Sequence, residues 1–125
     1  MTTRNQRLET EANVWFACVR PDGRPHLTPI WFVWVDGSIW LCTQTNAVKV
    51  RNIRANPNVS IALEDGNAPV TGEGRAMLHP QPDLPSAVRA AFIAKYEWDV
   101  VEPDNILIEI AITKWLQPSN TADVT

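Results

Sequence analysis

Short apolar runs rich in β-branched and aromatic residues, separated by turn residues, dominate the first third of the chain. Residues 13–20 (NVWFACVR) are rich in β-branched and aromatic residues, and residues 21–24 (PDGR) supply the proline and glycine of a β-turn. A long second strand is expected over 25–35. Asp36-Gly37 is a strong signal for a two-residue hairpin into a third strand at 38–43. This pattern predicts consecutive antiparallel strands.

The second strand is apolar on both of its faces. One alternating set is His26, Thr28, Ile30, Phe32 and Trp34, and the other is Leu27, Pro29, Trp31, Val33 and Val35. Such a strand is covered on both sides, and in a chain with few helices we expect a second subunit to supply the second cover. Pro29 has no N–H to give to a sheet, so it marks an edge, a bulge or a bend. We therefore expect a homodimer.

The rest of the chain predicts more strands and two or three short helices. The helices are a peripheral helix or arm at 1–11 that Thr3 can cap, one at 47–55 capped by Thr45 or Asn46, and an amphipathic one at 86–96. Strands are expected at 59–64, at 70–78, where two glycines suggest a bulge or tight bend, and at 106–112. Residues 117–125 are polar and are expected to fray.

This order favours a mainly β fold, a six-stranded antiparallel split β-barrel with peripheral helices, in a single domain over residues 1–125. A doubly wound α/β sheet is disfavoured, because the chain has neither repeated βαβ units nor a GxGxxG motif.

Composition and charge narrow the classes of partner. With a net charge of -3, the protein has no overall field that attracts nucleic acid or an anionic membrane. No apolar run is long enough to span a bilayer, and the first residues lack the apolar core of a secretory signal, so we expect a cytoplasmic protein. Cys18 and Cys42 form no CxxC or Cys/His cluster and are expected to be buried free thiols. His26 and His79 are too isolated to define a metal site.

Residues 42–54 form the main candidate binding site. They combine a strand end, the hydrogen-bonding residues Thr43, Gln44 and Thr45, a helix start, and the cations Lys49, Arg51 and Arg54. A helix N-terminus carries free N–H groups and a partial positive charge, so this segment is suited to phosphate. The alternative is that the three cations only solvate a surface helix.

His26 and Thr28 are a second polar group, on one face of the second strand. A structural histidine is the alternative interpretation there. The sequence offers no nucleophile with a base beside it and no paired carboxylates at catalytic spacing, so the catalytic residues are not identified. A chain that supplies binding groups but few reactive ones is typical of an enzyme whose cofactor performs the chemistry.

Several of these segments, in this order, resemble the pyridoxamine 5'-phosphate oxidase-like FMN-binding split-barrel family. The similar segments are RPHLTPIWF at 24–32, the Asp-Gly hairpin, and LCTQTNAVKVRNIRANPNVSIALE at 41–64. The most specific part is the spacing of Lys49, Ile53 and Asn56-Pro57, followed at once by a strand. The resemblance covers residues 13–78, and the last strand and Trp115 fit in order.

The resemblance implies a homodimer with two flavin sites at the subunit interface. It assigns the cofactor phosphate to Lys49, with Thr43, Gln44, Thr45 and Arg51 near it. It also places the isoalloxazine beside His26, Thr28, Pro29, Ile30 and Trp31, and it brings Trp115 to the cofactor from the partner chain.

The expected function is therefore FMN-dependent transfer of hydride or electrons to a small molecule that the sequence does not identify. Vitamin B6 oxidation is disfavoured, because the chain lacks the extra basic residues near its end that bind a substrate phosphate. A deazaflavin-dependent reductase on the same fold is one alternative. A non-catalytic flavin or haem carrier or sensor is another, and a dimeric scaffold with an empty groove is a third.

Overall fold

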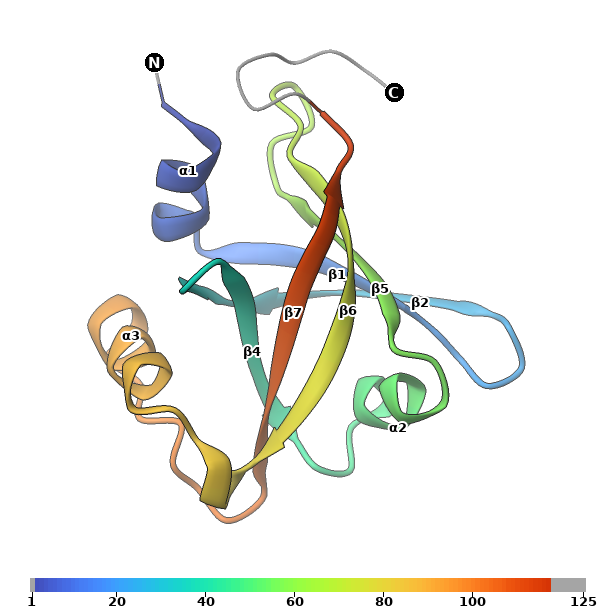
Figure 1. The fold of residues 1–125 in the computed structure, drawn as a ribbon, viewed down its shortest axis with the longest axis vertical. Coiled ribbons are helices and arrows are strands. Elements are labelled where there is room, and N and C mark those ends of the chain that lie inside the picture. The colour runs from blue at the N-terminus through green and yellow to red at the C-terminus, as the bar shows by residue number, and fades with distance from the viewer. Residues whose placement is uncertain (1, 118–125) are drawn as a thin grey trace.

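The computed structural model describes residues 2–117, which form a curled antiparallel sheet flanked by short helices (Figure 1). Seven strands lie in the order β2-β1-β5-β6-β7-β4-β3. The strands are β1 (Asn13–Val19), β2 (Pro25–Trp31), β3 (Val33–Val35), β4 (Ser38–Gln44), β5 (Asn58–Leu63), β6 (Thr71–Pro80) and β7 (Asn105–Trp115). The helices are α1 (Arg4–Thr10), α2 (Val48–Ala55) and α3 (Ser86–Tyr96), with a short 3-10 turn, η1 (Gln81–Asp83). The predicted mainly β split barrel is confirmed.

The sheet has one strand more than the sequence predicts, because residues 25–35 form two strands. Strand β2 pairs with β1, whereas β3 pairs with β4 at the opposite edge of the sheet. Phe32 lies between them. Its N–H donates to the Tyr96 hydroxyl at 3.0 Å, and its carbonyl accepts from Lys95 Nζ at 2.9 Å. Helix α3 therefore stabilises the corner at which the chain leaves one edge and joins the other.

Alternating side chains of the strands build the core. In β1, Val14, Phe16 and Cys18 are buried, whereas Trp15 between them is 40% exposed. A second apolar cluster, which includes Val88 and Phe92, packs α3 against the outer face of β4 and β7. Both cysteines are free and buried, as predicted, and burial raises the pKa of the Cys42 thiol to about 12. A thiol with that pKa is unreactive at neutral pH.

The bulge suggested by the glycines of β6 is confirmed. The register between β6 and β7 shifts between Glu73 and Gly74, and the Thr113 hydroxyl donates to the Glu73 carbonyl at 3.2 Å. A Cβ atom on Gly74 would lie only 2.4 Å from the Ala111 carbonyl oxygen. The bulge thus brings the two backbones too close together for any side chain at position 74.

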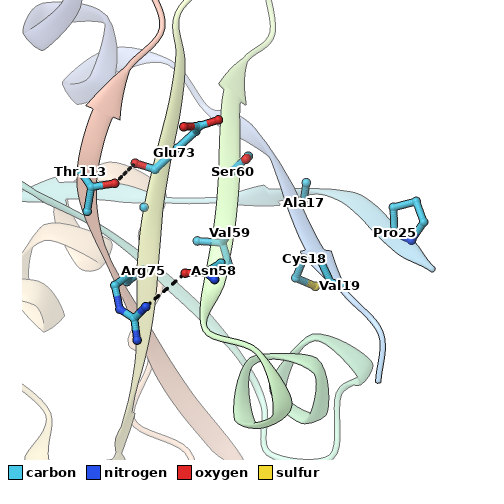
Figure 2. Close-up of a pocket in the computed structure, with 11 residues that line it drawn as sticks. Ala17, Cys18, Val19, Pro25, Asn58, Val59, Ser60, Glu73, Arg75 and Thr113 are labelled. Carbon is cyan, nitrogen blue, oxygen red and sulfur yellow. Dashed lines mark hydrogen bonds between the residues drawn. The ribbon is translucent and has the colours of Figure 1, made fainter. Parts of the chain in front are cut away.

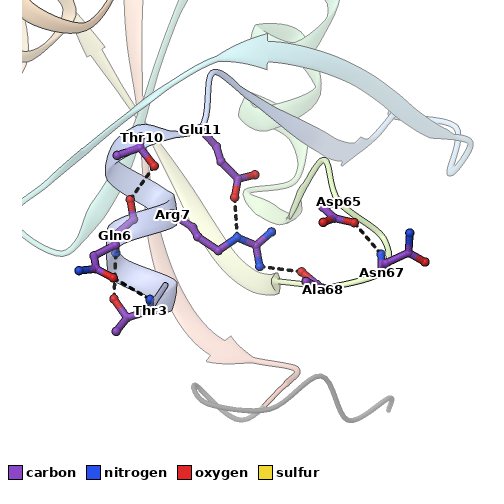
Figure 3. A network of polar contacts seen from close by, with 8 residues as sticks. All are labelled: Thr3, Gln6, Arg7, Thr10, Glu11, Asp65, Asn67 and Ala68. Atoms are coloured by element: carbon purple, nitrogen blue, oxygen red, sulfur yellow. Dashed lines mark hydrogen bonds and ion pairs between the residues drawn. The ribbon is translucent and has the colours of Figure 1, made fainter. Parts of the chain in front are cut away.

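Helix α1 is fastened to the loop between β5 and β6 (Figure 3). Thr3 and Gln6 form a reciprocal capping box, as the predicted Thr3 cap requires. Arg7 pairs with Glu11 and donates to the Ala68 carbonyl at 2.7 Å. The buried Leu8 side chain joins the main core. The first segment is therefore an integral part of the barrel rather than a loose arm.

Two predicted chain segments need correction. Helix α2 begins one residue later than expected, and its N-cap is Ala47, which supplies no side-chain hydrogen bond, instead of Thr45 or Asn46. Gln117, placed in the frayed tail, accepts a hydrogen bond from the Thr71 N–H at 2.8 Å. Residues 118–125 lie outside the described part of the chain. Within residues 2–117, no helix is long and apolar enough to cross a membrane.

Candidate functional site

The barrel is open along one side of β2. This strand pairs only with β1, so its other edge has no partner strand among the described residues. Pro29 therefore lies in an edge strand, as its missing N–H predicts. Strand β4 ends near the start of α2 (Figure 1). We use "the split" for the region bounded by the free edge of β2, the end of β4 and the first turn of α2.

Lys49 is the main cation of the split. Its ammonium is half-buried, and burial lowers its pKa, although Cys18 opposes this effect. The ion pairs formed within residues 2–117 do not include Lys49. Ala47 leaves the helix start uncapped, and within the described chain the N–H groups of Val48 and Lys49 have no acceptor. A cation without a counter-ion beside free helical N–H groups is suited to an oxyanion.

His26 belongs to the same electrostatic environment. Its pKa is lowered, first by burial and then by the positive charges of Arg20 and Lys49. Its Nδ1 atom lies 3.8 Å from the Cys18 sulfur. These effects favour the neutral imidazole, so His26 adds a polar group to the split without adding a positive charge.

Asn52 is a polar residue of this region that the sequence analysis missed. It is fully buried on α2, and its Nδ2 donates to the Cys18 sulfur at 3.4 Å, while its Oδ1 has no partner among residues 2–117. The hydroxyl of Thr28 is likewise buried without a partner in this part of the chain. An unpaired buried polar atom costs about 1–3 kcal/mol, so such atoms mark places where a ligand can supply the missing partner. Asn52 follows Lys49 by one helical turn, which is the signal that could have found it.

Three arginines line a cleft of about 230 Å³ between α2 and the turn that joins β1 to β2. The lining residues are Arg20, Pro21, Asp22, Arg24, Arg51 and Asn52. Arg24 pairs with Asp22 at 2.8 Å, whereas Arg20 and Arg51 have no carboxylate partner in the described part of the chain. The structure therefore places Arg51, a predicted phosphate ligand, with two arginines that are distant from it in sequence. This arrangement concentrates positive charge in a protein of net charge -3.

The residues predicted beside the isoalloxazine lie on two different faces of β2. His26, Thr28 and Ile30 are half-buried on the inner face, whereas Pro29 and Trp31 are exposed on the outer face. One face of the Trp31 ring is stacked on Tyr96, with the ring centroids 4.4 Å apart and the planes within 8°. A flat ligand can approach both sets of residues only along the free edge of the strand.

The remaining predicted residues lie at opposite ends of β7. Thr43, Gln44 and Thr45 lie beside its first residue, where the Thr45 N–H donates to the Asp104 carbonyl at 2.8 Å. They adjoin the start of α2, as predicted. Trp115 is the last residue of β7, and the Arg4 guanidinium lies 4.3 Å from its ring centroid. Within one chain Trp115 is therefore remote from Lys49, and its approach from a partner chain stays a prediction.

A groove of about 470 Å³ crosses the outer face of the sheet between β1 and β6 (Figure 2). Ala17, Val19 and Pro25 form its apolar side, and on the other side Arg75 donates to the Asn58 side chain at 3.2 Å. The groove adjoins the exposed apolar side chains of Trp15 on β1 and Leu27 on β2. This part of the outer surface therefore has the character of an interface.

Residues 3–118 match the family model described as pyridoxamine 5'-phosphate oxidase. The chain belongs to this family. The match covers the strands, helices and residues of the split, and it confirms the resemblance drawn from the sequence. Among curated proteins, no sequence matches the chain.

Several solved structures share the fold of this chain. A structure titled F420 reductase is 27% identical, with a TM-score of 0.71, and the match covers 86% of this chain and 91% of that one. A conserved hypothetical protein from Mycobacterium tuberculosis is 28% identical, with a TM-score of 0.70, over 84% of this chain and 75% of that one. The haem storage protein HutZ from Vibrio cholerae is 19% identical, with a TM-score of 0.69, over 83% of both chains, which is a likeness of fold alone.

Proposed function

We propose that the protein is an oxidoreductase that binds a flavin-type cofactor in the split and transfers hydride or electrons to a small molecule. The observation that carries the proposal is Lys49, whose ammonium is half-buried and has no carboxylate partner among the described residues, and which belongs to the uncapped first turn of α2. When bound, the flavin supplies the electron chemistry, and the protein supplies binding and orientation.

The residues of the split have separable roles in this proposal. Lys49 and the free N–H groups of α2 hold the phosphate. The unpaired Thr28 hydroxyl and the backbone edge of β2 are available to hydrogen-bond a polar ring edge. His26, held neutral by its surroundings, can donate or accept a hydrogen bond without competing with Lys49 for the anion.

The arginine cleft supports the alternative cofactor, a deazaflavin coenzyme. FMN carries one anionic group, which Lys49 and α2 can hold. A deazaflavin with an acidic tail needs a second cationic surface, and Arg20, Arg24 and Arg51 line such a surface next to α2. The 27% identity to the structure titled F420 reductase supports the same alternative. FMN stays the cofactor that we propose first.

The purified protein tests this function directly. We expect it to carry a flavin or deazaflavin, or to bind one when it is added, and to show the corresponding absorbance band, which bleaches on reduction. Mass spectrometry of the material released by heating identifies the molecule. Failure to bind either FMN or a deazaflavin would remove the function, and a haem Soret band that is lost in His26→Ala would replace it with haem carriage.

We also propose that the working form is a homodimer in which the partner covers the exposed apolar face of β1 and β2. Trp15, Leu27 and Trp31 are 40%, 60% and 45% exposed on that face. Such side chains on neighbouring strands are typical of a subunit interface. In this dimer, Trp115 reaches the cofactor of the other subunit.

The dimer predicts a strong effect of charge at Leu27. Leu27→Glu should shift the protein from dimer to monomer in analytical ultracentrifugation, because the carboxylate would be buried without a partner at the interface. Met77→Glu is the matched control, since Met77 is also 60% exposed but lies on β6, two strands away from β1 in the sheet. A Leu27→Glu protein that stays dimeric would rule out this interface.

A further inference from the structure

Lys95 has an unusual environment at the end of α3. Its Nζ atom donates to the Phe32 carbonyl at 2.9 Å and lies 3.9 Å from the centroid of the Phe32 ring. The ion pairs within residues 2–117 do not include Lys95. The amine is therefore fixed in place by a carbonyl and an aromatic ring rather than by an opposite charge.

A cavity of about 330 Å³ lies beside this amine. Its walls are mostly apolar, and its lining residues are Glu9, Val33, Trp34, Ala91, Ala94 and Lys95. The small side chains of the two alanines leave the space next to the lysine open. A short aliphatic group attached to Nζ would find apolar surface there instead of water.

A substantial fraction of this amine is also neutral near pH 7.5. Burial lowers the pKa of Lys95 to about 8, although the carboxylate of Glu11 opposes this effect. At pH 7.5 roughly one quarter of such an amine is neutral, compared with about one in a thousand for a lysine of ordinary pKa. Only the neutral amine is a nucleophile, so Lys95 combines a reactive nitrogen with an adjacent apolar cavity.

We propose that Lys95 is an acylation site that accepts a short aliphatic acyl group from an acyl thioester. The amine nitrogen attacks the thioester carbonyl, the new C–N bond forms, and the C–S bond breaks. The thiolate leaves, and the proton lost from nitrogen neutralises it. No electron donor or acceptor is needed. This inference is independent of the proposed cofactor function.

Acylation would alter the corner between β2 and β3. The amide has no positive charge, so the cation-π contact with Phe32 is lost, and it keeps a single N–H to donate. Phe32 directly follows the last residue of β2. A modification on α3 would thus act on the strand whose free edge borders the split.

The chain has three lysines, Lys49, Lys95 and Lys114, so the test can follow each one. The purified protein is incubated at pH 7.5 with a butyryl thioester of N-acetylcysteamine, and peptide mass spectrometry measures modification of each lysine over time. Lys95 should react about tenfold faster than the exposed Lys114, because its larger neutral fraction outweighs its lower intrinsic nucleophilicity. A Lys95 rate equal to or below that of Lys114 would overturn the proposal.

A second measurement tests the cavity separately from the amine. Ala94→Leu fills part of the cavity, and it should slow butyrylation of Lys95 several-fold while leaving Lys114 unchanged. Ala90→Leu is the matched control, because Ala90 is exposed on α3 but does not line the cavity. If Ala94→Leu and Ala90→Leu give the same Lys95 rate as the unmodified sequence, the cavity does not receive the acyl group.

Discussion

Replacing Lys49 with alanine is expected to weaken FMN binding by about 1–3 kcal/mol, which is a roughly 5- to 150-fold increase in Kd. The ammonium is half-buried and has no counter-ion within the described chain, so a phosphate would supply its only strong partner. The variant should remain folded, because removing an uncompensated, partly buried charge takes away an unfavourable interaction. A fluorescence titration of apoprotein with FMN measures the change.

Lys114→Ala is the control for charge alone. Lys114 is exposed on β7, and its removal changes the net charge by the same amount. We expect its Kd for FMN to stay within about twofold of the value for the unmodified protein, because exposed charges at a distance are screened by salt. Equal effects of the two substitutions would remove Lys49 from the site and leave only a general effect of net charge.

Replacing Gly74 with alanine is expected to lower the free energy of unfolding by about 1–3 kcal/mol, in the range of overpacked interiors. The new Cβ would lie 2.4 Å from the Ala111 carbonyl oxygen and 3.1 Å from an Ile110 side-chain carbon. The first of these atoms belongs to the backbone of β7, so the clash can be relieved only by moving a strand. Urea denaturation should therefore show a lower midpoint with an unchanged slope.

Gly66→Ala is the matched control for losing a glycine. Gly66 lies in the loop between β5 and β6, and a Cβ there would meet nothing within 4 Å. The free energy of unfolding of this variant should stay within about 1 kcal/mol of that of the unmodified protein. Any change should be an increase, because alanine restricts the unfolded chain more than glycine does. Equal urea midpoints for the two variants would show that the bulge between β6 and β7 accommodates a side chain at position 74 without loss of stability.

Local signals predicted most of the fold. The Asp36-Gly37 turn forms as expected, with φ of 52° and 78° at its two residues, the left-handed conformation that a tight hairpin requires. The β-branched and aromatic residues at 13–20 marked β1. The break at Phe32 was missed because Trp31-Phe32-Val33 is an uninterrupted apolar run, and the interactions that form the corner come from α3, far along the chain.

The candidate site was predictable only where its residues are neighbours in sequence. Lys49 and the end of β4 were found because they adjoin the start of a helix. The arginine cleft was missed because Arg20 and Arg24 meet Arg51 only after β1 and β2 have folded against α2. Trp31 beside a ligand ring stays a prediction. The stacking of one face of its ring on Tyr96 was not predicted, because Tyr96 belongs to α3, far along the chain.

The account depends on the split binding the phosphate of a flavin-type molecule. Titrating the protein in parallel with FMN and riboflavin, which differ only in that phosphate, tests this most directly. The expected result is that FMN binds at least about tenfold more tightly, and that Lys49→Ala removes most of the difference. Equal affinity of the unmodified protein for FMN and riboflavin would contradict the account. The account would also be contradicted if the protein bound none of FMN, riboflavin and a phosphate-bearing deazaflavin.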